Sequence, residues 1–523
     1  MLLGEVLKNI NKKHKKIRFS NIKFDSRDCK PNDLFFAISG NNSDGNRYIK
    51  NAIKNGARII VSNSKLKNDY KKNILFIHDK NPRKLLSDVS NKFYKLKPNN
   101  IIAVTGTNGK TSVANFYQQI LTLNNKKVAS IGTLGVLSKK IKITTNNTTI
   151  DPVSTHKILQ DLKKSKIENV ILEASSHGLK QHRLNNIKFK TAIFTNLSRD
   201  HLDYHKTFKD YLNSKLILFN KLVINNGNII FDEKIKETNQ LNNISQKRKL
   251  KKYTFGSPKS FIRILKIQKI NDYKEIDLII NKKKYSFKTS LIGKIQIKNL
   301  IFAIIAAYLS KLKINQILRS IHKIKPIKGR FEKIGNLKNN ANVILDYAHT
   351  PIALKTSILN IKEEFPLSKI SLVFGCGGNR DIYKRSMMGS IAENYCENVY
   401  LTDDNPRNEN PKKIRNELKK FILKNKGFDF GSRSLAIRNA IRNADPQEII
   451  LIAGKGHEQT QIYKNKILNI SDKRIVKNLK LTIKKINKKK QNFKQNKLIL
   501  SHILGKDKPI NFNGLSIDTR SIK

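Results

Sequence analysis

A glycine-rich segment that holds a lysine is the part of the sequence best suited to chemistry. Residues 103–112 read AVTGTNGKTS and open with a short apolar run. A strand, a glycine-rich loop and a helix N-terminus together form an anion site, because backbone N–H groups and the helix dipole meet phosphate oxygens. Lys110 would reach the terminal phosphates and the Thr111 hydroxyl could bind Mg²⁺. Only two residues separate Gly106 from Gly109, so a tight turn is the alternative to the predicted ATP or GTP site.

Acidic residues follow three other short apolar runs. Glu173 follows residues 170–172, and Asp346 follows residues 343–345. Residues 399–401 lead into a segment that contains two aspartates. Ligands of open α/β sheets bind beyond the carboxyl ends of the strands. These carboxylates are therefore expected to lie in functional sites.

The runs that must position these residues share one pattern. Each is a continuous apolar stretch that ends in Gly, Asp, Asn, Ser or a similar polar residue, and a helical periodicity follows. Continuous apolar strands that alternate with helices predict an α/β fold with parallel, doubly wound sheets. The runs are residues 101–104, 170–172, 192–194, 343–345, 372–374, 399–401 and 449–452.

Shifts in composition predict four parts of the chain. They are residues 1–98, 99–328 and 329–487, followed by a basic linker and tail at 488–523. Within the tail, residues 515–523 resemble residues 22–30, with Asp, Arg and a final Lys at matching positions. For so short a repeat, chance similarity is the alternative explanation.

The charge and the cysteine content narrow the class of protein. Lys and Arg number 104 against 39 Asp and Glu, a formal net charge of +65. Most of this charge is Lys spread among Asn and Ile, and we find no zinc-finger spacing or aromatic-basic RNA motif, so a compositional surface is favoured over a nucleic-acid site. Three cysteines exclude a disulfide framework. With no apolar run long enough to span a bilayer and no signal-peptide pattern, we expect a soluble cytoplasmic protein.

Nine motifs occur in one order over about residues 20–475. In this order they resemble the Mur ligase family of peptidoglycan synthesis. The resemblance implies an N-terminal UDP-MurNAc-binding domain, a central P-loop ATPase domain and a C-terminal Rossmann-like domain that binds an amino acid. The motifs are FDSRDCKPNDLFFAISG (24–40), GTNGKTS (106–112), NTT (147–149), EASSHGLKQHR (173–183), TNLSRDHLDYH (195–205), DYAHTP (346–351), FGCGGNRD (374–381), DDNPR (403–407) and AGKGHE (453–458).

The resemblance implies an ATP-dependent ligase that joins an amine to a carboxylate through an acyl phosphate, with Mg²⁺ as cofactor. Lys215 matches a lysine that the family carries as a CO₂-derived carbamate, although a surface lysine is the alternative. Before Asn299 the family usually has Phe-Asn where this chain has Ile295 and Gln296. The implied catalytic residues are Lys110, Glu173, His201 and Lys215, and the implied metal ligands are Thr111, Glu173, His201 and carbamoylated Lys215. The implied ATP-binding residues are Gly106, Thr107, Asn108, Gly109, Lys110, Thr111, Ser112, Asn299, Arg330 and Asp346.

The substrates implied by the resemblance are UDP-MurNAc-L-Ala-D-Glu and meso-2,6-diaminopimelate, besides ATP. The positions that match UDP-substrate contacts are Phe24, Ser26, Asn41, Asn42, Ser43, Asn147, Thr148, Thr149, Ser175, Gln181 and Arg183. The positions that match diaminopimelate contacts are Arg380, Asp404, Asn405, Pro406, Arg407, Gly454 and Glu458.

Arg407 is the residue from which we predict the amino acid that is added. A guanidinium binds a carboxylate through two hydrogen bonds, and diaminopimelate has a distal carboxylate that lysine lacks. Family members that add lysine usually have a small residue at this position. The sequence therefore predicts diaminopimelate rather than L-lysine.

Three alternatives remain open. The chain could be a lysine-adding ligase or another Mur-type ligase, such as the D-alanyl-D-alanine-adding enzyme or folylpolyglutamate synthase. From a different class, it could be a basic nucleic-acid-binding protein with a vestigial ATP site. Independently of these, the tail at 488–523 could be the start of a following, fused Mur ligase.

Overall fold

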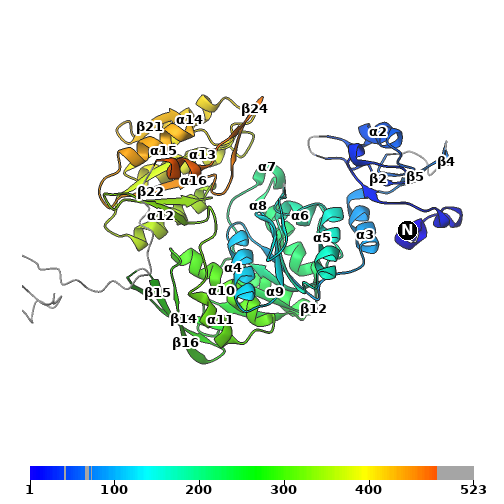
Figure 1. Cartoon of the computed structure of the whole chain (residues 1–523), viewed down its shortest axis with the longest axis horizontal. Coiled ribbons are helices and arrows are strands. Elements are labelled where there is room, and N and C mark those ends of the chain that lie inside the picture. The colour runs from blue at the N-terminus through cyan, green and yellow to red at the C-terminus, as the bar shows by residue number, and fades with distance from the viewer. Residues whose placement is uncertain (41–42, 65–69, 72, 146, 272, 480–523) are drawn as a thin grey trace, which may run out of the picture. The chain divides into compact units, whose positions relative to one another are not determined.

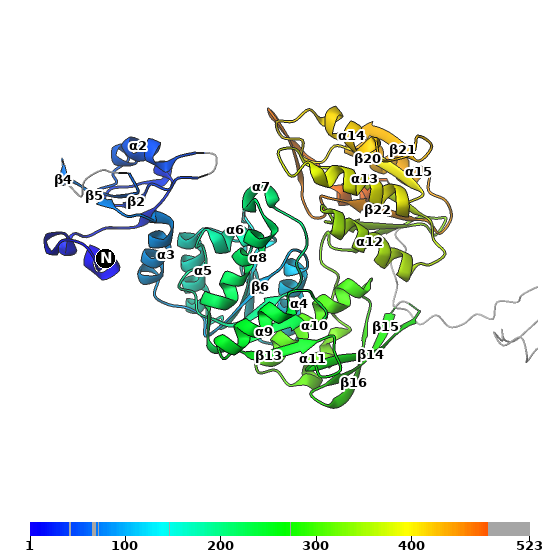
Figure 2. The same cartoon turned by 180° about the vertical axis from the view of Figure 1, so that it is seen from behind.

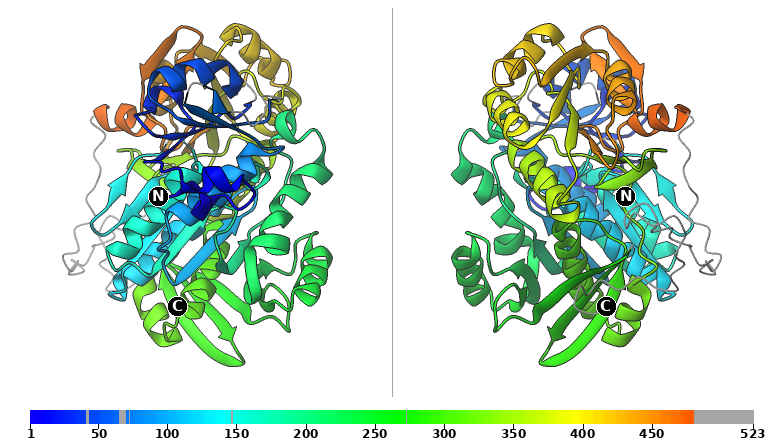
Figure 3. Two further views of the ribbon diagram at one scale, coloured as in Figure 1. Left: turned by 90° about the vertical axis from the view of Figure 1, so that its right-hand side faces the viewer. Right: turned by 90° about the vertical axis from the view of Figure 1, so that its left-hand side faces the viewer.

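The computed structural model describes residues 1–40, 43–64, 70–71, 73–145, 147–271 and 273–479 (Figure 1). Asn41, Asn42 and the proposed tail at 488–523 lie outside the described residues. The expectation of doubly wound sheets is confirmed, since three mainly parallel sheets follow one another along the chain. Figures 2 and 3 give further views, in which the colour runs from blue at the N-terminus to orange-red near the last described helix.

The first sheet has the strand order β1-β2-β3-β5-β4. The apolar side chains of one face pack with α1 (Leu3–Val6) and α3 (Pro82–Phe93), and those of the other face pack with α2 (Ile49–Lys54). The strands are β1 (Ile22–Lys23), β2 (Leu34–Phe36), β3 (Ile59–Ser62), β4 (Tyr70–Lys71) and β5 (Ile74–His78).

The central sheet has the order β16-β15-β14-β13-β12-β11-β6-β10-β7-β8-β9. Its middle strands are parallel, while antiparallel hairpins extend both edges. The strands are β6 (Asn100–Thr105), β7 (Val128–Gly132), β8 (Gly135–Ser138), β9 (Lys142–Ile143), β10 (Asn169–Glu173), β11 (Phe189–Phe194), β12 (Val223–Asp232), β13 (Lys251–Phe255), β14 (Ile262–Ile270), β15 (Tyr273–Ile280) and β16 (Lys283–Thr289).

Helices cover both faces of the central sheet, because its strands are apolar on both sides. The helix α10 is apolar almost all round and packs with α4 in the core of one face. The helices α4 (Lys110–Leu123), α10 (Lys294–Leu309) and α11 (Ile314–Ile321) cover that face. The helices α5 (Pro152–Lys164), α6 (Ser176–Lys180), α8 (Phe208–Ile217) and α9 (Thr238–Lys247) cover the other, and α7 (Leu202–His205) precedes α8.

The third sheet has the order β17-β18-β22-β19-β20-β21 and is parallel except for β17. Its strands are β17 (Glu332–Asn336), β18 (Asn342–Asp346), β19 (Ile370–Phe374), β20 (Asn398–Thr402), β21 (Gly427–Gly431) and β22 (Ile449–Ala453), and a separate hairpin joins β23 (Thr460–Tyr463) and β24 (Lys466–Asn469). One face packs with α12 (Pro351–Glu364), α13 (Tyr383–Tyr395) and α14 (Pro411–Lys419), and the other with α15 (Arg433–Arg442) and α16 (Asp472–Asn478).

A buried ion pair lies beneath the end of β22. Arg433 Nε and Nη2 donate to the two carboxylate oxygens of Asp472 at 2.7 and 2.8 Å, and both side chains are fully buried. Arg433 Nη2 also donates to the carbonyl of Ala453, the last residue of β22. The pair therefore supports the loop that follows this strand.

Among the described residues no helix is long and apolar enough to cross a membrane. Cys29, Cys376 and Cys396 are buried free thiols.

We predict that Asp472→Ala lowers the free energy of unfolding by about 3–5 kcal/mol, because it leaves the Arg433 guanidinium buried without a counter-charge. Chemical denaturation followed by circular dichroism measures the change. Asp445→Ala is the matched control, since its partner Lys369 is exposed and the pair contributes little. Equal effects of the two substitutions would contradict the prediction.

Candidate functional site

Two glycines shape the loop between β6 and α4. Gly109 has φ of +87°, and a Cβ atom there would lie 2.5 Å from Asn299 Oδ1. A Cβ atom on Gly106, at φ +144°, would lie 1.9 Å from Thr195 Oγ1. Left-handed backbone and close packing thus both require glycine. The loop leads directly into the N-terminus of α4, as an anion site requires.

Lys110 folds over this loop. Its Nζ donates to the carbonyls of Gly106 and Thr107, each at 2.8 Å. Burial lowers the pKa of Lys110, and the Glu173 carboxylate opposes that shift. Asn196, from the loop after β11, accepts a hydrogen bond from the Asn108 N–H at 3.0 Å. The phosphate loop is therefore fixed by a second segment.

Glu173 and Thr111 lie in direct contact. Thr111 Oγ1 donates to Glu173 Oε2 at 2.8 Å, and the N–H of Thr133 donates to Oε1 at 2.9 Å. A hydroxyl and a carboxylate are hard oxygen donors of the kind Mg²⁺ prefers. These two predicted metal ligands therefore fit the ion.

His201 lines the same cavity as Thr111 and Glu173. Burial lowers the pKa of His201 to about 4, so its imidazole is neutral at pH 7. Its Nε2 lies 3.3 Å from the carboxylate of Asp200. In the part of the chain that the structure describes, no group of three or more His, Cys, Asp or Glu side chains could hold a metal by itself.

Lys215 is a buried residue of α8, not a surface lysine. Its side chain is 1% exposed, and Nζ donates to the carbonyl of Gly106 at 2.7 Å. Burial, followed by the charge of Lys110, places the pKa of Lys215 well below its ordinary value. Its Nζ also lies 4.4 Å from the centre of the Tyr211 ring. One loop carbonyl therefore accepts hydrogen bonds from two predicted catalytic lysines.

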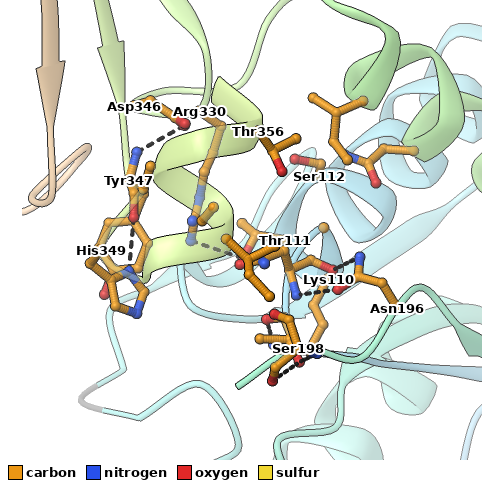
Figure 4. A pocket seen from close by; sticks show the side chains of 18 of the residues that line it. Lys110, Thr111, Ser112, Asn196, Ser198, Arg330, Asp346, Tyr347, His349 and Thr356 are labelled. Atoms are coloured by element: carbon orange, nitrogen blue, oxygen red, sulfur yellow. Dashed lines mark hydrogen bonds between the residues drawn. The ribbon is translucent and has the colours of Figure 1, made fainter. Parts of the chain in front are cut away.

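A cavity of about 380 Å³ opens between the phosphate loop and residues 330–357 (Figure 4). Arg330 stacks on the Tyr347 ring at 4.1 Å, and its Nη2 donates to Thr111 Oγ1 at 3.4 Å. Asp346 accepts hydrogen bonds from the N–H groups of Phe331 and Tyr347. Burial raises the pKa of Asp346. The cavity therefore combines cationic and polar groups from both walls.

Gln296, which stands where the family usually has asparagine, lines the same cavity. Its Nε2 donates to the carbonyl of Arg330 at 3.1 Å, and its Oε1 accepts from Asn299 at 3.5 Å. Gln296 therefore connects Asn299, which lies against Gly109, to Arg330. Arg330 in turn donates to Thr111.

A second cavity, of about 160 Å³, adjoins the first. Asp200, His201, Tyr347 and His349 line both cavities. The predicted amino-acid ligands that line the second are Arg380, Asp404, Asn405, Arg407, Gly454 and Glu458, whereas Pro406 does not.

Arg407 is held in this second cavity by its backbone and side chain. Its φ is +54°, and Nη1 donates to the carbonyls of Gly378 and Asn405 at 2.8 and 3.3 Å. Burial and the nearby Arg380 lower the pKa of Arg407. Within the described residues no carboxylate forms an ion pair with it. The guanidinium is therefore suited to an anionic ligand.

Lys455 contacts two residues that line this cavity, Asn405 and Glu458. It is 1% exposed, and its Nζ donates to Asn405 Oδ1 at 3.1 Å and to Glu458 Oε2 at 3.2 Å. Tyr347 donates to the other oxygen of Glu458 at 3.1 Å. The cavity therefore presents fixed cations and fixed carboxylates, as a zwitterionic amino acid requires.

A third cavity, of about 560 Å³, holds part of the predicted UDP-substrate set. Thr148 instead lines the first cavity, and Ser26 lines none of the three. Thr149 and Ser175 also line none of the three cavities, and the Ser175 N–H donates to Thr149 Oγ1 at 2.9 Å. The predicted residues that line this cavity are Phe24, Ser43, Asn147, Gln181 and Arg183.

Several residues that line the cavities or contact their lining escaped the sequence prediction, although they stand in motifs that it used. Tyr347 and His349 belong to DYAHTP, Asp200 belongs to TNLSRDHLDYH, and Lys455 belongs to AGKGHE. Because they stand next to predicted residues in the same motifs, the sequence could have identified them as candidates. Arg83, in the third cavity, lies outside all nine motifs.

Comparisons with known proteins agree on one family. Residues 18–94 match the Mur ligase family catalytic domain, residues 104–307 the Mur ligase middle domain, and residues 329–456 the Mur ligase glutamate ligase domain. The chain is 39% identical to the UDP-N-acetylmuramoyl-L-alanyl-D-glutamate--2,6-diaminopimelate ligase of Rickettsia montanensis, covering 90% of this chain and 97% of that protein. The ligase of the same name from Buchnera aphidicola is 37% identical, covering 91% and 95%.

Solved structures show the same architecture. A structure of a UDP-N-acetylmuramoyl-L-alanyl-D-glutamate--2,6-diaminopimelate ligase matches with a TM-score of 0.65 at 27% identity, covering 91% of this chain and 98% of that one. The MurF ligase of Thermotoga maritima in complex with ADP matches with a TM-score of 0.60 at 17% identity, covering 83% and 93%. The second likeness supports the fold alone.

We predict that Gly109→Ala abolishes measurable ATP binding, because the added methyl group would meet Asn299 at a backbone angle that alanine adopts poorly. Titration calorimetry with ATP and Mg²⁺ measures the affinity. Gly335→Ala is the control, since a Cβ atom there makes only ordinary contacts of 3.4 Å or more. Normal ATP affinity in Gly109→Ala would show that the loop does not hold the nucleotide.

Proposed function

The chain belongs to the Mur ligase family, whose members are ATP-dependent ligases, and we propose that it adds meso-2,6-diaminopimelate to UDP-MurNAc-L-Ala-D-Glu. The observation that carries the proposal is the shared lining of the first two cavities. Asp200, His201, Tyr347 and His349 border both the phosphate-loop cavity and the cavity of Arg407. A phosphoryl group and an incoming amine could thus meet at one junction.

The proposed reaction proceeds in two steps. A carboxylate oxygen of the D-glutamyl residue attacks the γ-phosphorus of ATP, and the bond to ADP breaks. The amine of diaminopimelate then attacks the acyl carbon, the amide forms, and inorganic phosphate leaves as the amine loses a proton. Catalysis of such transfers is mainly positioning and stabilisation of charge. Lys110 and Arg330 supply positive charge beside the phosphate loop.

Mg²⁺ is the cofactor we propose, with Thr111, Glu173 and His201 as the residues that would hold it. When bound, the ion neutralises charge on the phosphate oxygens. The contact of Thr111 with Glu173 and the neutral imidazole of His201 support this assignment.

We further propose that Lys215 carries a carbamate. Its neutral amine would attack CO₂, form a C–N bond and release a proton, which converts a potential cation into an anion. The burial that lowers the pKa of Lys215 supports the reactive neutral amine. A carbamate so close to the phosphate loop could bind a second Mg²⁺.

The second cavity favours diaminopimelate over lysine. Arg407 offers its guanidinium for a distal carboxylate, and bound lysine would leave that cation unpaired. Two further parts of the proposal do not concern this cavity. We propose that the protein is cytoplasmic and that residues 488–523 are the start of a following Mur ligase.

The decisive experiment measures phosphate release from ATP with Mg²⁺ and UDP-MurNAc-L-Ala-D-Glu, with diaminopimelate or L-lysine added in parallel. We expect release with diaminopimelate alone. We expect Arg407→Ala to lose at least about tenfold in kcat/KM for diaminopimelate, because a charged hydrogen bond contributes about 1.5–3 kcal/mol.

Arg438→Ala on α15 is the control for Arg407, since Arg438 lines none of the three cavities. Release with lysine would reject the substrate choice and keep the ligase. Unchanged selectivity in Arg407→Ala would reject the role of that residue.

For the carbamate, we predict that enzyme stripped of CO₂ loses activity and regains it with bicarbonate. Lys215→Met should be inactive at all bicarbonate concentrations. Lys209→Met, an exposed lysine on the same helix, should behave as the parent chain. Bicarbonate-independent activity of the parent would count against the modification, and intact-mass measurement of the added 44 Da provides a second readout.

A further inference from the structure

The third cavity contains a cation that no sequence motif pointed to. Arg83 is the second residue of α3, after the helix cap Asn81. It lines the cavity together with Arg183, and Phe24 and Ser43 are among the other lining residues. Two guanidinium groups therefore line one cavity.

Arg83 has no anionic partner among the described residues. Its Nη2 donates to the carbonyl of Ser39 at 2.6 Å, and the side chain is half-buried. Burial lowers the pKa of Arg83, yet a guanidinium remains charged at pH 7. The charge is thus held beside the loop that leads to Ser43, without a carboxylate to neutralise it.

Arg183 is held by hydrogen bonds to two other residues. Its Nε and Nη2 donate to Gln181 Oε1 at 3.1 and 2.7 Å, and its Nη1 donates to the carbonyl of Thr149 at 2.6 Å. Burial lowers the pKa of Arg183, and the charge of Arg83 lowers it further. The two cations therefore repel each other across the cavity.

One carboxylate among the described lining residues partly offsets these charges. Asp151 lines the cavity, and its Oδ1 accepts the N–H of Ser154 as the N-cap of α5 at 2.8 Å. Two fixed guanidinium groups against one carboxylate leave the cavity cationic. Such an arrangement is stable when an anion binds between the cations.

The backbone beneath Arg83 is well anchored. Ser87 Oγ on α3 donates to the carbonyl of Asn185 at 3.1 Å, and Asn186 donates to Asp88 at 2.5 Å. The start of α3 is thereby tied to the segment that also carries Arg183. A guanidinium on such a base is preorganised for binding.

We propose that Arg83 binds the diphosphate of the UDP substrate. Its hydrogen bond to the Ser39 carbonyl holds it within the N-terminal domain, which also carries Phe24 and Ser43 and is expected to bind UDP-MurNAc. Arg183 instead contacts Thr149, whose hydroxyl donates to the carbonyl of Glu173 at 2.8 Å, and so stands nearer the reaction centre. A guanidinium matches phosphate oxygens through paired hydrogen bonds. The inference rests on the proposed function, because it takes a UDP-linked substrate as given.

The test compares the binding of uridine, UDP and UDP-MurNAc-L-Ala-D-Glu to the parent chain, Arg83→Gln and Arg83→Lys by titration calorimetry. We expect Arg83→Gln to weaken UDP and the full substrate by about ten- to a hundredfold, and uridine hardly at all. Arg83→Lys should recover part of the loss. The affinity for ATP should stay unchanged, which separates the effect from misfolding.

Lys84→Gln is the matched control, because Lys84 is the exposed next residue of the same helix. Parental UDP affinity in Arg83→Gln would overturn the inference and leave the proposed function intact. Loss with the full substrate but not with UDP would also overturn it, since Arg83 would then bind a peptide carboxylate. If the parent chain bound neither UDP compound, the proposed function itself would fail.

Discussion

The carboxylate and carbonyl of one buried residue, Glu173, connect the phosphate loop to the walls of two cavities. Its side chain accepts hydrogen bonds from Thr111 and Thr133, and its carbonyl accepts from Thr149. Gly132 leaves the space that this side chain needs, since a Cβ atom there would lie 2.1 Å from Oε1. Because the carbonyl of Thr149 also accepts from Arg183, one chain of hydrogen bonds connects the first cavity and the third cavity.

The connection depends on the parallel sheet. β10 pairs with both β6 and β7, so the carboxyl ends of these strands deliver Glu173, the phosphate loop and Gly132 to one edge. In the third sheet, β18 and β22 pair in the same way, and their ends deliver Asp346 and the loop of Gly454.

The seven predicted apolar runs are strands β6, β10, β11, β18, β19, β20 and β22, because an apolar run followed by a polar residue depends only on neighbours in the chain. The strands of the first sheet and the edge hairpins of the central sheet were not predicted. The sequence was a poorer guide to contacts between distant segments. Lys215 and Gly106 are 109 residues apart, and Arg330 and Thr111 are 219 apart. The burial of Lys215 follows from how α8 packs, which no local pattern records. The role of Gln296 likewise follows from Arg330, and the motif comparison registered only a missing asparagine.

Burial acts differently on the two kinds of cation in these cavities. It lowers the pKa of Arg83, Arg183 and Arg407, but arginine starts so high that each remains charged. It also lowers the pKa of Lys215, and there the ammonium becomes easy to deprotonate. Arginine therefore suits positions that must attract an anion without titrating, whereas lysine suits a buried position whose amine must react. An arginine at position 215 would stay charged and could not supply a neutral amine, and a lysine at position 83 would keep the charge without the paired hydrogen bonds of a guanidinium.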